Sequence, residues 1–193
     1  LTEVGPVDIG RIGGGAQRTG DSGTLQELVP RACGSLRHVG IREHPAMVGE
    51  RRRSFYQELK KIPNIKIISP AHDTFSLLQK AKLIFTISGT AGWEAVQLKK
   101  PVIVFSDIFY SVLPLVKKCA AISELPYLVK QQLTDFHHDE PTLLNFLAAV
   151  FKESAEIDLA RIWQVENAGQ LQNKSAELMP LVDLIAKKLN LNL

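Results

Sequence analysis

Three small polar residues between two apolar runs have the types and spacing to bind phosphate. Ser88, Gly89 and Thr90 separate the apolar run at residues 82–87 from a segment with a helical pattern. A helix beginning at Gly89 would leave backbone N–H groups without partners and carry partial positive charge, and both properties suit a phosphate. The hydroxyls of Ser88 and Thr90 would add donors. The alternative is that one hydroxyl only caps its own helix, and the spacing alone leaves both interpretations open.

Glu94 follows Thr90 by about one helical turn, which places the two side chains near one face of the expected helix. A carboxylate in this place could accept hydrogen bonds from the hydroxyls of a ribose while the start of the helix holds phosphate. An exposed surface charge, or an ion pair with Lys99, is the alternative. The spacing alone does not distinguish these alternatives, and it is the place of Glu94 behind the turn, with His44 ahead in the chain, that makes it a candidate catalytic residue.

His44 precedes Pro45 at the end of a short expected strand, and the proline restricts the backbone that presents the imidazole. A histidine can donate to a phosphate or act as an acid, although a purely structural histidine fits the same place. Carboxylates occur at comparable strand ends, one of them at Asp73, which could also be the N-cap of the next helix. The sequence thus predicts catalytic roles for His44 and Glu94 and binding roles for Glu43, Asp73, Ser88, Gly89 and Thr90.

Alternating strand and helix patterns must position these residues. Strands are expected at residues 36–44, 64–69, 82–87 and 101–105, with helical patterns between them. The last two runs are continuously apolar, which is typical of strands covered on both faces in a parallel sheet. The sequence therefore predicts an α/β fold with a Rossmann-like parallel sheet, helices on both faces and a helical C-terminal segment. Polar residues at the strand ends would meet at one edge, where such folds bind ligands.

The domain organisation follows from length and composition. A chain of 193 residues suits one core. Residues 1–34 are expected to be a Gly-rich lead-in or linker, because they show neither helical nor strand periodicity, and residues 35–193 to form the folded domain. The run GRIGGG matches neither a P-loop nor a dinucleotide fingerprint, which favours a structural role for it.

Charge and cysteine usage exclude several classes of protein. The formal net charge is +3, with the basic residues spread along the chain, so we expect no nucleic-acid partner. Cys33 and Cys119 lie far apart, and no HExxH motif occurs, so we expect no metal site and a reducing cytoplasm. No run approaches the roughly 18 apolar residues of a membrane span, and no signal peptide is recognised.

Several motifs occur together in the middle of the chain. They are REHP at residues 42–45, the run at residues 63–105, and FY at residues 109–110. Over about residues 36–130 they resemble the capsule polysaccharide biosynthesis family, which includes Kdo-transferring proteins and, more broadly, nucleotide-sugar glycosyltransferases of the GT-B type. GT-B enzymes have two Rossmann-like domains facing a cleft. The resemblance implies that residues 35–193 are the C-terminal, nucleotide-sugar-binding half.

The resemblance also implies roles for individual residues. His44 with Pro45 would approach the phosphate or cytidine of the donor, residues 88–90 would contact the phosphate, and Glu94 would face the ribose or base. The donor would be a nucleotide sugar, with CMP-activated acidic sugars as the best-known class. The acceptor would be a glycan or a lipid-linked glycan. No further cofactor is implied, and any membrane association would be peripheral, through a parent protein.

Two departures from the family pattern leave alternatives open. Arg42 stands where many relatives have lysine, and nothing upstream resembles the N-terminal Rossmann domain that supplies the acceptor site. Transfer activity would then belong to a longer parent enzyme. One alternative is an enzyme like UDP-N-acetylglucosamine 2-epimerase, although SGTAGWEA lacks the double glycine and paired glutamates of that kind. The other is a non-catalytic nucleotide-binding or assembly module.

Overall fold

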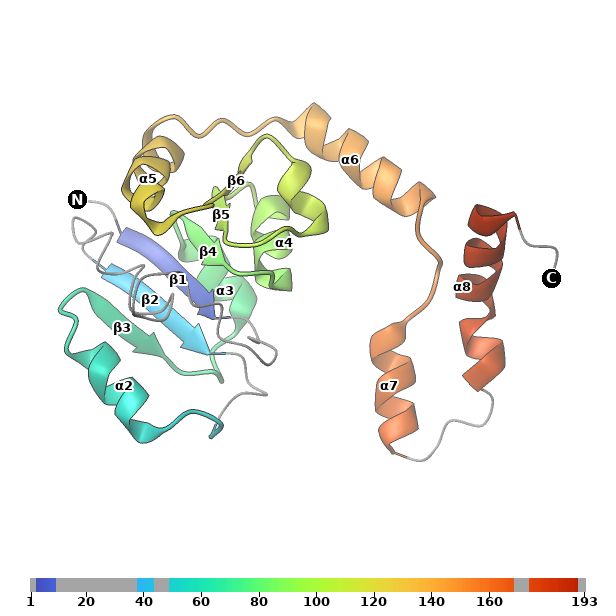
Figure 1. The fold of residues 1–193 in the computed structure, drawn as a ribbon, viewed down its shortest axis with the longest axis horizontal. Helices are drawn as coiled ribbons and strands as arrows, with labels where there is room; N and C mark the ends of the chain where they lie inside the picture. Colours follow the sequence, from blue (N-terminus) through green and yellow to red (C-terminus); the bar gives the residue numbers. More distant parts are fainter. Residues whose placement is uncertain (1–2, 10–37, 44–48, 169–173, 191–193) are drawn as a thin grey trace. The chain divides into compact units, whose positions relative to one another are not determined.

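The computed structural model describes residues 3–9, 38–43, 49–168 and 174–190. The chain divides into two compact units, Leu1–Asp139 and Glu140–Leu193. The first unit contains a parallel β-sheet with helices packed on it, and the second is helical (Figure 1).

The sheet of the first unit has six strands in the order β3-β2-β1-β4-β5-β6, and every neighbouring pair is parallel. This is the strand order of a doubly wound Rossmann fold, in which the order reverses between β1 and β4. The predicted fold class is therefore confirmed, and the architecture is consistent with one half of a GT-B fold. The strands are β1 (Glu3–Ile9), β2 (His38–Glu43), β3 (Ile65–Ile68), β4 (Ile84–Thr86), β5 (Val102–Val104) and β6 (Val116–Lys118).

Helices cover both faces of the sheet. On one face, Phe85 of β4 shares a buried cluster with Leu59 of α2 and Leu125 of α5. On the other face, the adjacent Thr86 meets Gly92 of α4, because successive side chains of a strand alternate. The helical elements of this unit are α2 (Arg53–Lys60), α3 (Thr74–Lys80), α4 (Thr90–Gln97), η2 (Phe109–Val112), η3 (Ile122–Glu124) and α5 (Leu125–Thr134).

The central strands after β1 are short and apolar, as their sequences predict. Ile84 and Phe85 of β4 and all of Val102–Val104 in β5 have 0% exposure. Burial on both faces explains why these runs are continuously apolar rather than alternating. Together they form a rigid base from which the loops at the carboxyl edge extend.

One prediction about the start of the chain is wrong. Residues 3–9, expected within a lead-in or linker, form β1, which pairs with both β2 and β4 in the middle of the sheet. Gly5 and Pro6 concealed the strand, because both residues are rare inside strands. The register shifts between Glu3 and Pro6, and such an irregularity tolerates a residue without an N–H. Residues 10–34 lie outside the described part, and the domain boundary at residue 35 stays a prediction.

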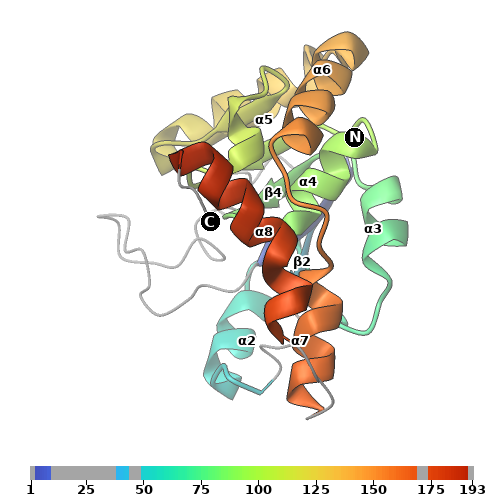
Figure 2. The same ribbon diagram turned by 90° about the vertical axis from the view of Figure 1, so that its right-hand side faces the viewer.

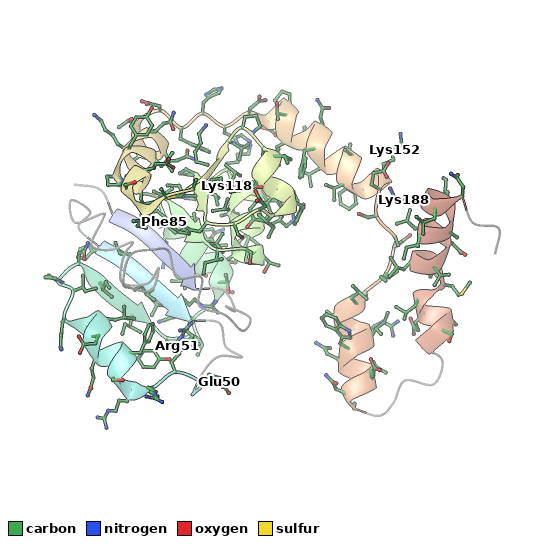
Figure 3. All side chains as sticks on the ribbon, in the orientation of Figure 1. Glu50, Arg51, Phe85, Lys118, Lys152 and Lys188 are labelled. Atoms are coloured by element: carbon green, nitrogen blue, oxygen red, sulfur yellow. The ribbon has the colours of Figure 1, made fainter. Side chains whose placement is uncertain are left out.

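The second unit contains the predicted C-terminal helices, α6 (Glu140–Lys152), α7 (Leu159–Asn167) and α8 (Lys174–Leu189). The helices α7 and α8 lie side by side in both views, joined by an ion pair between Arg161 and Glu177 (Figures 1 and 2). Lys188 of α8, labelled in Figure 3, pairs with Glu153 just after α6. Among the described residues, no helix combines the length and apolar character needed to span a membrane.

Candidate functional site

The turn between β4 and α4, residues 87–89, is the centre of the candidate site. It leaves the carboxyl end of β4, and the reversal of strand order beside β4 is where doubly wound sheets bind their ligands. Gly89 is the N-cap of α4 and has no side chain to cap the helix, while Ser88 and Thr90 on either side are exposed. The site therefore presents two hydroxyls beside the positive end of a helix.

Hydrogen bonds from buried or half-buried side chains hold this turn. The Gly89 N–H donates to Oγ1 of Thr86 at 3.0 Å. The Ser106 hydroxyl donates to the Ile87 carbonyl at 2.6 Å, and the Tyr110 hydroxyl donates to the Gly89 carbonyl at 2.7 Å. Because the Gly89 amide already has an acceptor, the N–H groups of α4 left for a ligand begin at Thr90.

Glu94 lies on α4, one turn beyond Thr90, and is half-buried. This position matches the prediction that Glu94 and Thr90 share one face of the helix. The carboxylate thus lies about one helical turn from the Thr90 side chain. Its predicted contact with a ribose stays a prediction.

Glu43 ends β2 and is only 7% exposed. One carboxylate oxygen accepts from Nε of Arg51 at 2.7 Å, and the other accepts from the Tyr56 hydroxyl. Figure 3 shows Arg51 beside the carboxyl end of β2. Burial, together with the bond to Glu43, raises the pKa of Tyr56 to about 12. This network fixes the start of α2 against β2, and a nucleotide contact by Glu43 stays a prediction.

Asp73 is the N-cap of α3, as the sequence suggested. Its Oδ2 accepts from the Ser76 N–H at 2.7 Å, and this bond holds the pKa of the exposed carboxyl below its ordinary value. The same edge also holds Arg42, which is 8% exposed and donates to the carbonyls of Pro70 and His72 at 3.1 and 3.3 Å. Nε of Arg42 is buried and has no hydrogen-bond partner among the described residues. A positive charge therefore lies beneath the loop that leads to Asp73.

The structure brings together only part of the predicted site. Ser88, Gly89, Thr90 and Glu94 lie on one turn and the helix that follows it, whereas Glu43 and Asp73 belong to β2 and the start of α3. His44 lies outside the described residues. Within the described part of the chain, no group of three His, Cys, Asp or Glu side chains could hold a metal ion.

Sequence reasoning missed the residues that support the turn. Ser106 and Tyr110 are recognisable from sequence only as polar residues after a strand, because nothing in the spacing reveals which carbonyls their hydroxyls reach. The place of Asp8 was missed together with β1, and its register partners are Arg42 and Thr86. The glycine-rich run at residues 10–15 follows the end of β1 directly, a signal that would have been available had the strand been recognised.

Comparisons with known proteins agree with the resemblance seen in the sequence. The family model described as "Capsule polysaccharide biosynthesis protein" matches residues 11–133. No curated protein matches.

Among solved structures, the chain is similar to two structures of Thermosulfurimonas dismutans KpsC and to the glycotransferase of kitacinnamycin. For the beta Kdo 2,4 transferase the identity is 19%, with 68% of this chain and 45% of that chain covered and a TM-score of 0.41. For the beta Kdo 2,7 transferase the identity is 16%, with 70% of this chain and 46% of that chain covered and a TM-score of 0.45. For the glycotransferase of kitacinnamycin the identity is 12%, with 76% of this chain and 38% of that chain covered and a TM-score of 0.40.

The chain spans less than half the length of these solved chains. The family model covers more than half of the present chain, and the residues it matches include those of the turn between β4 and α4. The chain belongs to the capsule polysaccharide biosynthesis protein family.

Proposed function

We propose that this chain is the donor-binding domain of a glycosyltransferase that builds bacterial capsular or other surface polysaccharide. The observation that carries the proposal is the β4–α4 turn, where two exposed hydroxyls flank the start of a helix at the reversal of strand order. Such a site suits the phosphate of a nucleotide sugar, and CMP-activated acidic sugars are the donor class we favour. The acceptor would be a glycan or lipid-linked glycan bound by another part of a longer enzyme.

In the proposed reaction, the start of α4 and the hydroxyls of Ser88 and Thr90 stabilise negative charge as it develops on the leaving nucleotide phosphate. Glu94 accepts hydrogen bonds from the ribose one helical turn further along. His44 acts as a donor or acid toward the phosphate, a role that rests on its motif with Pro45. This arrangement does not require a metal ion. The two widely separated cysteines fit the cytoplasm as the compartment.

Calorimetric titration of the folded chain with CMP, CDP, UDP and GDP tests the proposal. We expect binding, with CMP preferred, and Ser88→Ala or Thr90→Val should each weaken it about tenfold, the effect of losing a hydrogen bond to a charged group. Ser123→Ala removes an exposed hydroxyl from η3 and is the matched control. This element follows β6, which lies two strands from β4 in the sheet. No binding of any of these nucleotides by folded protein would refute the proposal.

Glu94→Gln separates the ribose contact from the phosphate contact. It should weaken binding of CMP while leaving binding of the 2′,3′-dideoxy analogue of CMP unchanged, because the analogue lacks the hydroxyls that the carboxylate would accept from. Glu58→Gln, an exposed glutamate on α2, is the control. Equal losses of affinity for CMP and for the dideoxy analogue would show that Glu94 acts only in local structure.

A further inference from the structure

We propose that Ser106 and Tyr110 are positioning residues that orient the phosphate-binding amides of the β4–α4 turn. Both residues follow β5, so the loop after β5 sets the geometry of the β4–α4 turn that would touch the ligand. The inference rests on the proposed function, since it assigns the supporting side chains of that site. It predicts that removing either hydroxyl weakens recognition of phosphate and leaves recognition of the nucleoside intact.

Side-chain hydrogen bonds hold three successive peptide units of the turn. The Ser106 hydroxyl holds the carbonyl of Ile87, Thr86 holds the N–H of Gly89, and the Tyr110 hydroxyl holds the carbonyl of Gly89. In a planar trans peptide, the C=O and the following N–H point in opposite directions. Fixing the Ile87 carbonyl therefore points the Ser88 N–H away from the Ser106 hydroxyl. In the same way, fixing the Gly89 carbonyl points the Thr90 N–H away from the Tyr110 hydroxyl.

The Tyr110 hydroxyl has little freedom to move. Its side chain is 0% exposed, and its ring stacks on Trp93 at 6.0 Å and meets Phe109 edge-on at 5.2 Å. Gly92 lies directly beneath it, and a Cβ at that position would come within 2.3 Å of the hydroxyl oxygen. The close approach of α4 to Tyr110 thus requires glycine at residue 92. A buried, packed hydroxyl is what a preorganised site needs, because it costs no rearrangement when the ligand arrives.

The same bonds decide which donors are left for a ligand. The Gly89 N–H is used within the turn, and the Gly89 carbonyl accepts from both Tyr110 and the Gly92 N–H. Ligand recognition then falls to the amides and the hydroxyls of Ser88 and Thr90. Glycine at residue 89 serves close approach and the N-cap, rather than supplying the donor itself.

Tyr110→Phe removes the hydroxyl and keeps the ring, so it tests the inference with little change in packing. Titration of the whole chain with CMP and with cytidine should show about fivefold weaker binding of CMP, the effect of one lost neutral hydrogen bond, and unchanged binding of cytidine. Tyr127→Phe, which removes the hydroxyl of an exposed tyrosine on α5, should change neither affinity. Ser106→Ala should repeat the selective loss and guards against a folding defect specific to Tyr110.

A measurement without ligand tests the geometry directly. In amide nuclear magnetic resonance spectra, Tyr110→Phe should shift the signals of residues 89–91, and Tyr127→Phe should leave them unmoved. Unchanged signals, or equal losses for CMP and cytidine, would overturn the positioning role while the proposed function stands. If the folded wild-type chain binds none of CMP, CDP, UDP and GDP, the proposed function fails and the positioning role fails with it.

Discussion

Gly92→Ala measures how tightly α4 packs against the groups that hold the β4–α4 turn. An added Cβ would lie 2.3 Å from the Tyr110 hydroxyl oxygen and 2.6 Å from Cγ2 of Thr86. Both distances are far inside van der Waals contact. Neither neighbour can yield easily, because Tyr110 and Thr86 are 0% and 1% exposed. The substitution should therefore destabilise the first unit, although alanine normally favours a helix.

Opposing effects set the magnitude. Replacing glycine by alanine in a helix gains at most about 1 kcal/mol. Overpacking a well-filled core costs about 1–3 kcal/mol, and displacing the Tyr110 hydroxyl from Gly89 loses one hydrogen bond, about 1 kcal/mol. The net expectation is a loss of about 2 kcal/mol in the free energy of unfolding. For a unit of 139 residues this lowers Tm by roughly 6 °C.

Urea and thermal unfolding followed by circular dichroism measure the loss, and double variants locate its cause. In a Tyr110→Phe background the shortest contact is gone, and in a Thr86→Ser background Cγ2 is gone while the hydroxyl stays, so each background should reduce the cost of Gly92→Ala. Gly49→Ala is the control, because Gly49 has a φ of 91° and no atom of the described residues would lie within 4 Å of its added Cβ. Its cost is backbone strain and should not change with Tyr110. A Gly92→Ala chain as stable as wild type would refute the packing on which the positioning role depends.

Two further predictions concern the other carboxylates at this edge. The pKa of Tyr56 is raised to about 12, so the contribution of Tyr56 to stability is complete below its ordinary pKa of 10.0 and is lost as the pH rises toward 12. The urea midpoint should therefore fall more steeply over this pH interval for wild type than for Tyr56→Phe. Parallel curves would contradict the network with Glu43. The pKa of Asp73 is lowered, so its cap stabilises α3 above the ordinary pKa of an aspartate and is lost in more acidic solution. Asp73→Ala should lower the unfolding midpoint at neutral pH, Asp73→Asn should retain most of it, and the difference between wild type and Asp73→Ala should shrink in acid. A constant difference would contradict the cap.

The elements around the candidate site could be predicted from sequence because their signals are local. Continuous apolar runs marked β4 and β5, and the small residues between the first run and its helix marked the β4–α4 turn. The strand β1 was missed because Gly5 and Pro6 oppose strand propensity, and its place depends on pairing with residues far along the chain. Propensity is a weak guide wherever tertiary pairing decides the structure.

Within the site, residue types could be predicted but partners could not. The sequence indicated that Ser88 and Thr90 lie at a helix start, and it placed Glu94 on the same helix. It also suggested Asp73 as a cap, and the structure confirms that. The bond between Tyr110 and Gly89 joins residues 21 positions apart and depends on how η2 lies against α4. No pattern in the intervening residues specifies this geometry, so the supporting residues emerged only from the fold.

The central place of β1 makes the sheet suited to fragment complementation. This strand joins β2 to β4, with Asp8 in register with both Arg42 and Thr86. A chain shortened past Ile9 would expose the inner edges of two separate groups, β3 with β2 and β4 with β5 and β6. A peptide with the sequence of residues 3–9 could fill the slot between them, because parallel pairing on both sides satisfies its backbone. In such an experiment, assembly of the candidate site would depend on binding of the β1 peptide between β2 and β4.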